Sequence, residues 1–186
     1  MNEIINVKKY LETLTSKITP NKDILNKIIK IKNLIIKTKK NKSKILIFGN
    51  GGSAAIASHI SVDLTKNIKV KAMNFNEADL ITCFANDYGY EKWIEKTIDF
   101  YADKNDILIL ISSSGKSKNM INACKAAKRK KISKIITLTG SKKNNPLSKL
   151  GDINLWVDSN IYNHIENIHQ IWLLSICDLI KLNKVK

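Results

Sequence analysis

The stretch KILIFGNGGSAAIASHISVDL, residues 44–64, decides the fold of this chain. It begins with an apolar run, stops at a glycine-rich turn, and continues as a helical pattern near Ser53. Such a strand–turn–helix junction binds anions, because backbone N–H groups and the positive end of the helix converge there. Its glycine spacing fits neither the dinucleotide fingerprint nor the P-loop. The stretch therefore predicts an α/β fold with an anion site of another kind.

Further short apolar runs repeat this alternation of strand and helix along the chain. We predict helices between them, the last one over residues 161–182. Such runs are typical of a parallel sheet that is covered by helices on both faces, with ligands at the carboxyl ends of the strands. The five predicted strands cover residues 45–48, 70–75, 107–111, 135–138 and 153–157.

Residues 2–40 precede this sheet and carry apolar residues at helical spacing. Thr19-Pro20-Asn21 is expected to divide them into two helices. Residues 24–35 are apolar over so wide an arc that we expect this face to be buried, with another subunit as one partner to consider. The 186 residues are predicted to form one domain.

The formal net charge of +16 raises the hypothesis of nucleic-acid binding. Arg129 is the only arginine, however, although arginine is the preferred residue for bidentate contacts to phosphates and bases. The lysines are spread along the chain, as on a solvated surface. Nucleic acid is therefore a disfavoured partner.

Other features indicate a protein of the cytoplasm. There is no apolar run of about 18 residues that could span a membrane, and the N-terminus lacks the apolar core of a signal peptide. Cys83, Cys124 and Cys177 are widely spaced and form no metal or redox motif. We therefore expect reduced structural thiols and no membrane partner.

A second loop also has the features of an anion-binding site. The predicted strand that ends at residue 111 runs into Ser112, Ser113 and Ser114, then Gly115, and a helix begins near Ser117. Each hydroxyl can donate one hydrogen bond. Serines at this place could also serve only to cap the helix. Because a similar loop follows another strand, we interpret the two together as a phosphate cradle.

Six motifs occur in the order expected of one family, and with them the chain resembles the phosphoheptose isomerases of the sugar-isomerase (SIS) fold. That resemblance implies a three-layer sandwich: a five-stranded parallel sheet with helices on both faces, plus N-terminal helices. It divides the chain into oligomerisation helices over 1–43 and a phosphosugar-binding core over 44–186. The motifs are GNGGSAA (49–55), His59-x-x-x-Asp63, ANDYGYE (85–91), ISSSGKS (111–117), TLTG (137–140) and HIENIHQIWLLSICDLI (164–180).

The family is tetrameric, with active sites at subunit interfaces. The implied reaction converts sedoheptulose 7-phosphate to heptose 7-phosphate, a precursor for lipopolysaccharide or capsule. The resemblance assigns substrate-binding roles to ten residues of this chain. The serines that hold the phosphate are Ser53, Ser112, Ser113, Ser114 and Ser117; Asn50, Gly51 and Gly52 shape the floor, and Asn86 and Asp87 touch the sugar.

The catalytic set departs from the family. Relatives place a His and a Glu on the helix after the glycine turn, and a Gln and a second His on the last helix, around zinc. This chain keeps His59, has Asp63 for the Glu and Glu166 for the Gln, and has Leu174 where the second His stands. We expect His59, Asp63 and Glu166 to form the catalytic set and an altered or weakened divalent-metal site. His169 is an alternative for the lost histidine, although its register differs.

Three hypotheses stay open at this point. The chain is a phosphoheptose isomerase, an SIS enzyme that acts on another phosphosugar, or a protein that binds a phosphosugar or a protein partner without turnover. The third has a precedent in a relative that binds the bacterial replication initiator. Leu174 is the residue that raises it, since leucine can neither transfer a proton nor bind a metal.

Overall fold

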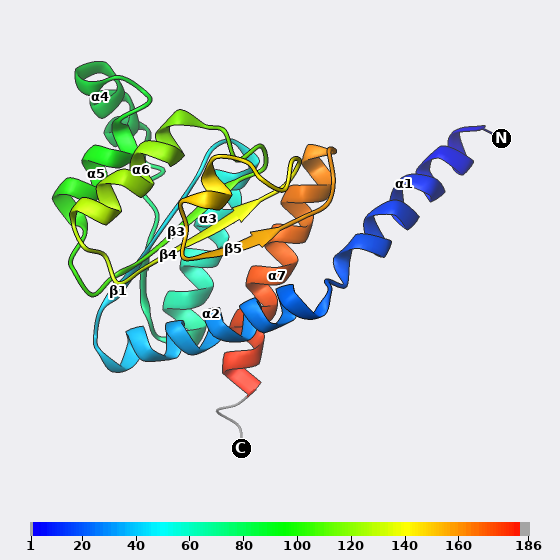
Figure 1. Ribbon diagram of the computed structural model, residues 1–186, viewed down its shortest axis with the longest axis horizontal. Helices are drawn as coiled ribbons and strands as arrows, with labels where there is room; N and C mark the ends of the chain where they lie inside the picture. The colour runs from blue at the N-terminus through cyan, green and yellow to red at the C-terminus, as the bar shows by residue number, and fades with distance from the viewer. Residues whose placement is uncertain (1, 183–186) are drawn as a thin grey trace.

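The computed structural model describes residues 2–182. Its centre is a parallel sheet with strand order β2-β1-β3-β4-β5 (Figure 1). All five predicted strands are present, and the predicted order of strands and helices along the chain is confirmed. The strands are β1 (Lys44–Gly49), β2 (Lys71–Met73), β3 (Ile107–Ser112), β4 (Lys134–Thr139) and β5 (Ile153–Trp156).

Helices cover both faces of the sheet, so the predicted three-layer sandwich is confirmed (Figure 1). One face carries α2 (Lys22–Lys40), α3 (Gly52–Asp63) and α7 (Tyr162–Leu182); a short π-helix, Leu64–Ile68, continues α3. The other face carries α4 (Ala78–Tyr88), α5 (Trp93–Tyr101) and α6 (Lys118–Arg129), and a 3-10 turn, Leu147–Lys149, precedes β5.

The strands are apolar on both faces because each face packs against its own helices. In β1, Ile45 and Ile47 belong to the core beneath α2, α3 and α7, whereas Leu46 and Phe48 belong to the core beneath α5 and α6. Alternate side chains of a strand point to opposite faces, and both faces here are dry. Two cores thus hold the strand ends in fixed positions.

The N-terminal region forms the two predicted helices, with α1 (Asn2–Ile18) ending just before Pro20. The Asn21 side chain caps α2 by accepting a hydrogen bond from Ile24 N at 3.0 Å. The apolar arc of α2 packs mainly into the chain's own core, through Ile24, Ile28, Ile31 and Ile35. Burial within the chain therefore accounts for most of this arc.

α1 differs from the helices of the sandwich because it extends away from the body, and none of its residues is buried (Figure 1). Its ring contact with the body joins Tyr10 to His164, at 4.3 Å between ring centroids. Within residues 2–182, no helix is both long and apolar enough to cross a membrane. The three cysteines are free thiols; Cys124 and Cys177 are buried and Cys83 is exposed.

Candidate active site

The two predicted anion loops lie side by side because β1 and β3 are paired, with Gly49 opposite Ile111. Gly51 takes a φ of +54°, which favours glycine, and α3 begins at the next residue. A Cβ at Gly49 would collide with the backbone of Ser53. The glycine turn therefore brings the N-terminus of α3 against the end of its own strand.

A cavity of about 120 Å³ lies between the loops. Ser53, Ser112 and Ser113 are buried, and the Ser113 hydroxyl has no hydrogen-bond partner within the described chain. The Ser112 and Ser117 hydroxyls are 3.4 Å apart. A buried hydroxyl without a partner is unfavourable unless water or a ligand satisfies it. We call this cavity the serine cradle; its lining is Asn50, Ser53, Ile111, Ser112, Ser113, Ser114, Ser117, Tyr162 and Glu166.

Asn50 is fixed at the edge of the cradle by two residues that the sequence analysis missed. Its amide exchanges hydrogen bonds with the amide of Asn119, at 2.9 and 3.1 Å, and its oxygen accepts from the Tyr90 hydroxyl at 3.1 Å. Asn119 lies on α6, two residues after Ser117. Its place just after the serine loop marks Asn119 as a possible site residue. Its pairing with Asn50 could not be read from the sequence, because the two residues lie 69 positions apart.

A wider cleft of about 610 Å³ adjoins the cradle and shares Asn50 and Ser117 with it. Asn86 and Asp87, predicted to touch the sugar, are exposed at the end of α4 and line neither space. The Asn86 amide donates to Asp87 Oδ1 at 3.0 Å. The loop that follows them, from Tyr88 to Lys92, does line the cleft.

Glu166 and His59 lie between α3 and α7 but have different partners. Glu166 is at the cradle: the Ser53 hydroxyl is 3.4 Å from Glu166 Oε1, and a Cβ at Gly52 would collide with this carboxylate. His59 lies further along α3, with its Nδ1 3.1 Å from Gln170 Nε2. Gln170 is a further residue that the sequence did not reveal, since only the fold places it beside His59.

The third predicted ligand, Asp63, accepts a hydrogen bond from Asn67 Nδ2 at 3.0 Å. Within residues 2–182 there is no group of three His, Cys, Asp or Glu side chains that could hold a metal ion. His59, Asp63 and Glu166 therefore do not converge on one point in this protomer. The donor set of a single chain does not fit the zinc site that the family implies.

The other two histidines are structural. His169 is fully buried, with its Nε2 3.2 Å from the Thr139 carbonyl, and burial lowers its pKa to about 4. His169 thus faces the end of β4 and does not replace the lost histidine. His164 is also fully buried and packs against Tyr10, and Leu174 packs against the apolar core.

Comparison with known proteins agrees with this architecture. The family model of the SIS domain matches residues 9–140. The phosphoheptose isomerase of Aliarcobacter butzleri (strain RM4018) is 37% identical over 183 residues, or 94% of each chain. That of Helicobacter pylori (strain ATCC 700392 / 26695) is 36% identical over 154 residues, which cover 80% of this chain and 79% of the relative.

Two solved structures extend the likeness to the whole fold. The phosphoheptose isomerase of Neisseria gonorrhoeae has a TM-score of 0.86 at 27% identity and covers 97% of this chain and 98% of its own. The enzyme from Francisella tularensis has a TM-score of 0.87 at 26% identity and covers 98% of this chain and 100% of its own. This chain belongs to the phosphoheptose isomerase family of SIS-domain proteins.

Proposed function

We propose that this protein is a phosphosugar isomerase that interconverts sedoheptulose 7-phosphate and heptose 7-phosphate for surface-polysaccharide precursors. The observation that carries the proposal is the serine cradle, where the buried Ser113 hydroxyl has no partner in the described chain. The cradle lies at the start of the helix that also carries His59 and Asp63. Membership of the phosphoheptose isomerase family supports the same substrate.

The cradle suits a phosphate monoester. The N-terminus of α3 brings backbone N–H groups and a positive dipole end to the cavity. Hydroxyls from both loops surround the same space and can each donate to a phosphate oxygen. We assign Ser53, Ser112, Ser113, Ser114 and Ser117 to the phosphate, with Asn50, Gly51 and Gly52 as the floor. Asn86 and Asp87 line neither the cradle nor the cleft in this protomer, so their assignment to the sugar rests on the family resemblance alone.

The spacing along α3 fits a sugar chain that extends from the phosphate. Ser53 and His59 are six residues apart, which corresponds to about 9 Å along a helix. A seven-carbon sugar in its open form has the same order of length from the phosphate to its reacting end. Carbons 1 and 2 would then lie near His59 when the phosphate lies in the cradle.

The reaction moves one proton between two carbons and one between two oxygens. A base takes a proton from C1 of the ketose, the enediolate forms, and a proton is returned to C2; the hydroxyl proton on O1 is released while O2 gains one. The carboxylates of Asp63 and Glu166 can act as bases, and the His59 ring can donate to the oxygens. We propose that all three residues contribute to turnover.

For the metal, we propose that a divalent cation binds more weakly here than in relatives with two histidines. His59, Asp63 and Glu166 are the remaining candidate ligands, and they do not converge within the protomer. Two carboxylates and one imidazole also favour harder cations than zinc. Elemental analysis after dialysis against a chelator tests this; stoichiometric zinc that survives dialysis would contradict it.

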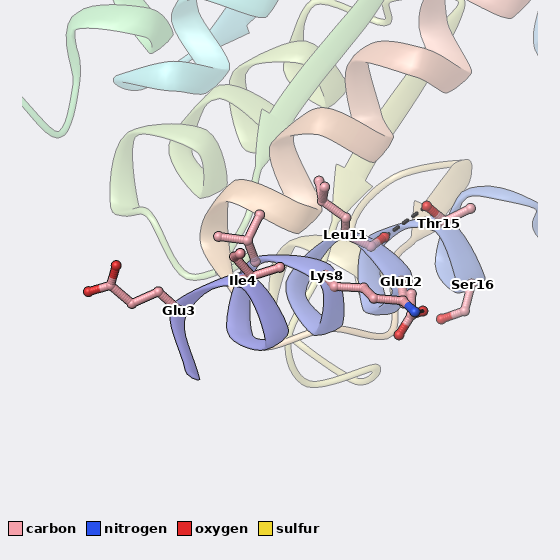
Figure 2. Close-up of a pocket in the computed structure, with 8 residues that line it drawn as sticks. Glu3, Ile4, Lys8, Leu11, Glu12, Thr15 and Ser16 are labelled. Carbon is pink, nitrogen blue, oxygen red and sulfur yellow. Dashed lines mark hydrogen bonds and ion pairs between the residues drawn. The ribbon is translucent and has the colours of Figure 1, made fainter. Parts of the chain in front are cut away.

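We further propose that residues 1–43 assemble the protein into a homo-oligomer, most simply a tetramer. Figure 2 shows the face of α1 that carries Ile4 and Leu11, which are 77% and 52% exposed. Together with Val7, which is 61% exposed, they line an open apolar groove. A lone 17-residue helix with such a face is only marginally stable in water. Light scattering should report a multiple of 21.0 kDa, and a monomer at micromolar concentration would contradict assembly.

The test of the activity is incubation of the purified protein with sedoheptulose 7-phosphate, with added zinc in one arm and a chelator in the other. Appearance of the aldoheptose phosphate supports the proposal. Leu174, which packs in the core, is the specific observation that favours a second candidate, a phosphosugar-binding protein without turnover. Binding measured by calorimetry without conversion in either arm would favour that candidate.

A further inference from the structure

Asn119 is the polar member of the buried side chains of α6, and it is 2% exposed. The other buried side chains of this helix are apolar and pack in the core beneath α5 and α6: Met120, Ala123, Cys124, Ala126 and Ala127. Burial of an amide is unfavourable unless its hydrogen bonds are made. Asn119 makes them with the Asn50 amide, at 2.9 and 3.1 Å, and its Oδ1 also accepts from Met120 N at 3.0 Å. The polar group that α6 buries therefore serves a contact at the carboxyl end of the sheet.

The two hydrogen bonds between Asn50 and Asn119 join the two loops of the serine cradle; we call this pair the amide tie. Asn50 lies in the glycine turn that leads into α3, and Asn119 follows the serine loop in the first turn of α6. Within residues 2–182, no other side-chain hydrogen bond connects residues 49–53 with residues 111–119. Two facing amides exchange the same two hydrogen bonds when both are turned over, so the tie does not depend on the orientation of either amide.

The cradle needs such a tie because two helix N-termini meet there. Ser53 lies in the first turn of α3, Ser117 directly precedes α6, and both line the cavity. The N-terminus of each helix carries a partial positive charge, so the two ends repel each other until an anion lies between them. α3 and α6 also pack on opposite faces of the sheet, so neither core holds both loops (Figure 1). A direct link between the loops keeps their hydroxyls at the separation that a phosphate requires.

We propose that Asn119 is a positioning residue, which through Asn50 ties the glycine turn to the serine loop and preforms the serine cradle for phosphate. This inference rests on the proposed function, in which the cradle holds the phosphate group. Asn119 does not line the cradle, so it acts without touching the phosphate. A preformed site binds more tightly than one whose loops the ligand must first order. Loss of the amide tie should therefore weaken binding of the phosphate group, whatever is attached to it.

Calorimetry with two probes tests the amide tie. Inorganic phosphate is small enough to occupy the cradle alone, whereas sedoheptulose 7-phosphate also extends beyond it. Asn119→Ala should weaken binding of both probes by the same factor, about tenfold, which is the scale of two lost hydrogen bonds. The matched control is Asn154→Ala, because Asn154 accepts from the Thr137 and Thr139 hydroxyls at 2.9 and 3.1 Å but lines neither the cradle nor the cleft. Both affinities of this control should stay within about twofold of the wild type.

A double-mutant cycle shows whether Asn119 acts through Asn50. Asn50→Ala already breaks the amide tie, so the addition of Asn119→Ala should change the affinity for inorganic phosphate by less than about twofold. Two residues that acted independently would multiply their losses. Asn119→Leu covers the case in which Asn119→Ala does not fold, because leucine is of similar size and suits a buried position. It should show the same loss of affinity, and urea unfolding verifies that each variant is folded.

Kinetics separate positioning from a general loss of structure. The phosphate lies away from the reacting carbons, so Asn119→Ala should raise KM about tenfold and lower kcat by less than about threefold. A partly unfolded variant would instead lose kcat at an unchanged KM, because only the fraction of active protein changes. The inference is overturned by unchanged affinity for inorganic phosphate, by a loss confined to sedoheptulose 7-phosphate, by multiplied losses in the double variant, or by loss of kcat at an unchanged KM.

The proposed function can fail separately from this inference. If the wild type binds both probes but does not convert sedoheptulose 7-phosphate, the isomerase proposal fails, and the affinities still decide the role of Asn119. If the wild type binds neither probe, the cradle is not a phosphate site, and the inference about Asn119 is overturned.

Discussion

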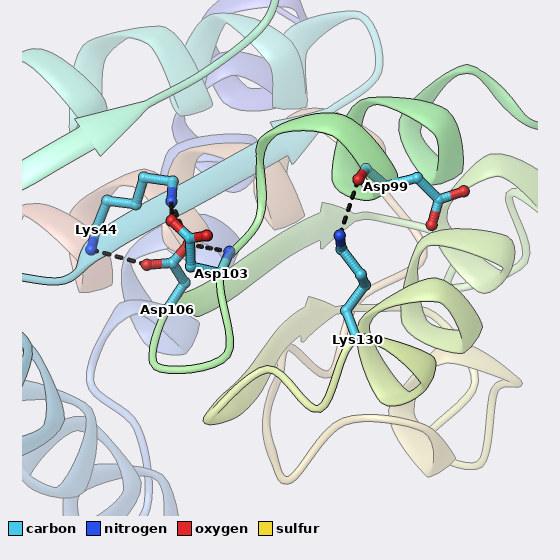
Figure 3. Close-up of polar contacts among 5 residues, drawn as sticks. All are labelled: Lys44, Asp99, Asp103, Asp106 and Lys130. Carbon is cyan, nitrogen blue, oxygen red and sulfur yellow. Dashed lines mark hydrogen bonds and ion pairs between the residues drawn. The ribbon is translucent and has the colours of Figure 1, made fainter.

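The two ends of the sheet differ in whether a buried polar side chain has hydrogen-bond partners within the protein. At the amino end, Asp106 is 1% exposed and accepts from Lys44 N at 3.0 Å and Asp103 N at 2.7 Å, with Lys44 Nζ 2.6 Å away (Figure 3). At the carboxyl end, the buried Ser113 hydroxyl has no partner within the described chain. The protein itself satisfies the buried carboxylate at the amino end, whereas the buried hydroxyl at the carboxyl end is left for the ligand that we propose.

Charges at the amino end support each other. Burial tends to lower the pKa of the Lys44 ammonium, but hydrogen bonds to Asp103 and Asp106 outweigh it, so the pKa lies above its ordinary value. Nearby, Lys130 Nζ donates to the Asp99 carbonyl at 2.9 Å and joins the ends of α5 and α6 (Figure 3). These interactions therefore stabilise the folded protein at the amino end of the sheet.

The largest effect on stability is expected from a substitution at the amino end of the sheet. Asp106→Ala leaves two backbone N–H groups and the Lys44 ammonium without their acceptor, and should lower the free energy of unfolding by about 3 kcal/mol. Urea unfolding measures this. Asp103→Ala is the control, because its side chain is 82% exposed and the loss should stay below about 1 kcal/mol. A loss in Asp106→Ala as small as in the control would contradict the comparison.

A second large effect should appear with pH at the carboxyl end. The pKa of His169 is lowered to about 4 by burial, below the ordinary value of 6.5, so the unfolded state binds the proton more readily. Stability is therefore complete above about pH 6.5 and is lost as the pH falls towards 4, by about 3 kcal/mol in total.

The measurement is urea unfolding of the wild type and His169→Gln between pH 4 and pH 7. Glutamine can donate to the Thr139 carbonyl but does not titrate. The wild type should lose stability relative to the variant as the pH decreases. A constant difference between the two proteins across this range would show that His169 is not the titrating group.

Ser113→Ala, at the carboxyl end of the sheet, is expected to have an effect of intermediate size on phosphosugar binding. Because the Ser113 hydroxyl has no partner in the described protein, its removal should leave the free energy of unfolding unchanged or slightly higher. Binding of sedoheptulose 7-phosphate should weaken by about 1 to 2 kcal/mol, one charge-assisted hydrogen bond. Ser112→Ala with Ser114→Ala should weaken binding by up to twice this amount. Unchanged affinities in calorimetry would refute the phosphate assignment.

The smallest effect concerns Glu166, whose carboxylate lines the cradle. Glu166→Gln removes a like charge near the phosphate and keeps the shape, so binding should tighten by no more than about 1 kcal/mol. If Glu166 also carries a proton, kcat should fall in the same variant. Equal kcat for both proteins from pH 6 to pH 9 would remove Glu166 from the catalytic set.

Most of the fold could be predicted from local sequence, because it depends on local rules. The glycine turn at 49–52 and Pro20 fix where elements begin or end, and the apolar runs fix the strands. The predicted strand over 70–75 is shortened to β2, Lys71–Met73, at the edge of the sheet. Edge strands have only one neighbour to extend their pairing, and only the assembled sheet shows where that pairing stops.

The candidate site could be predicted less completely, for a physical reason. Each anion loop directly follows its own strand, so the sequence correctly predicted that both loops lie at the carboxyl ends of the strands. The pairing of His59 with Gln170 joins positions 111 apart, and that of Asn50 with Asn119 joins positions 69 apart. The expected grouping of His59, Asp63 and Glu166 depends on side-chain directions across two helices, which spacing on one helix does not determine.

The central claim is that the carboxyl end of the sheet binds a phosphosugar and isomerises it at its far end. The most direct measurement is NMR of sedoheptulose 7-phosphate incubated with the protein in D₂O, with Asp63→Asn run in parallel. The account predicts that the wild type forms the aldoheptose phosphate, with deuterium at C2 wherever the base exchanges its proton with solvent before returning it, and that Asp63→Asn slows product formation by about a hundredfold or more. Neither product nor deuterium at C1 or C2 with the wild type, in the presence or absence of zinc, would contradict it.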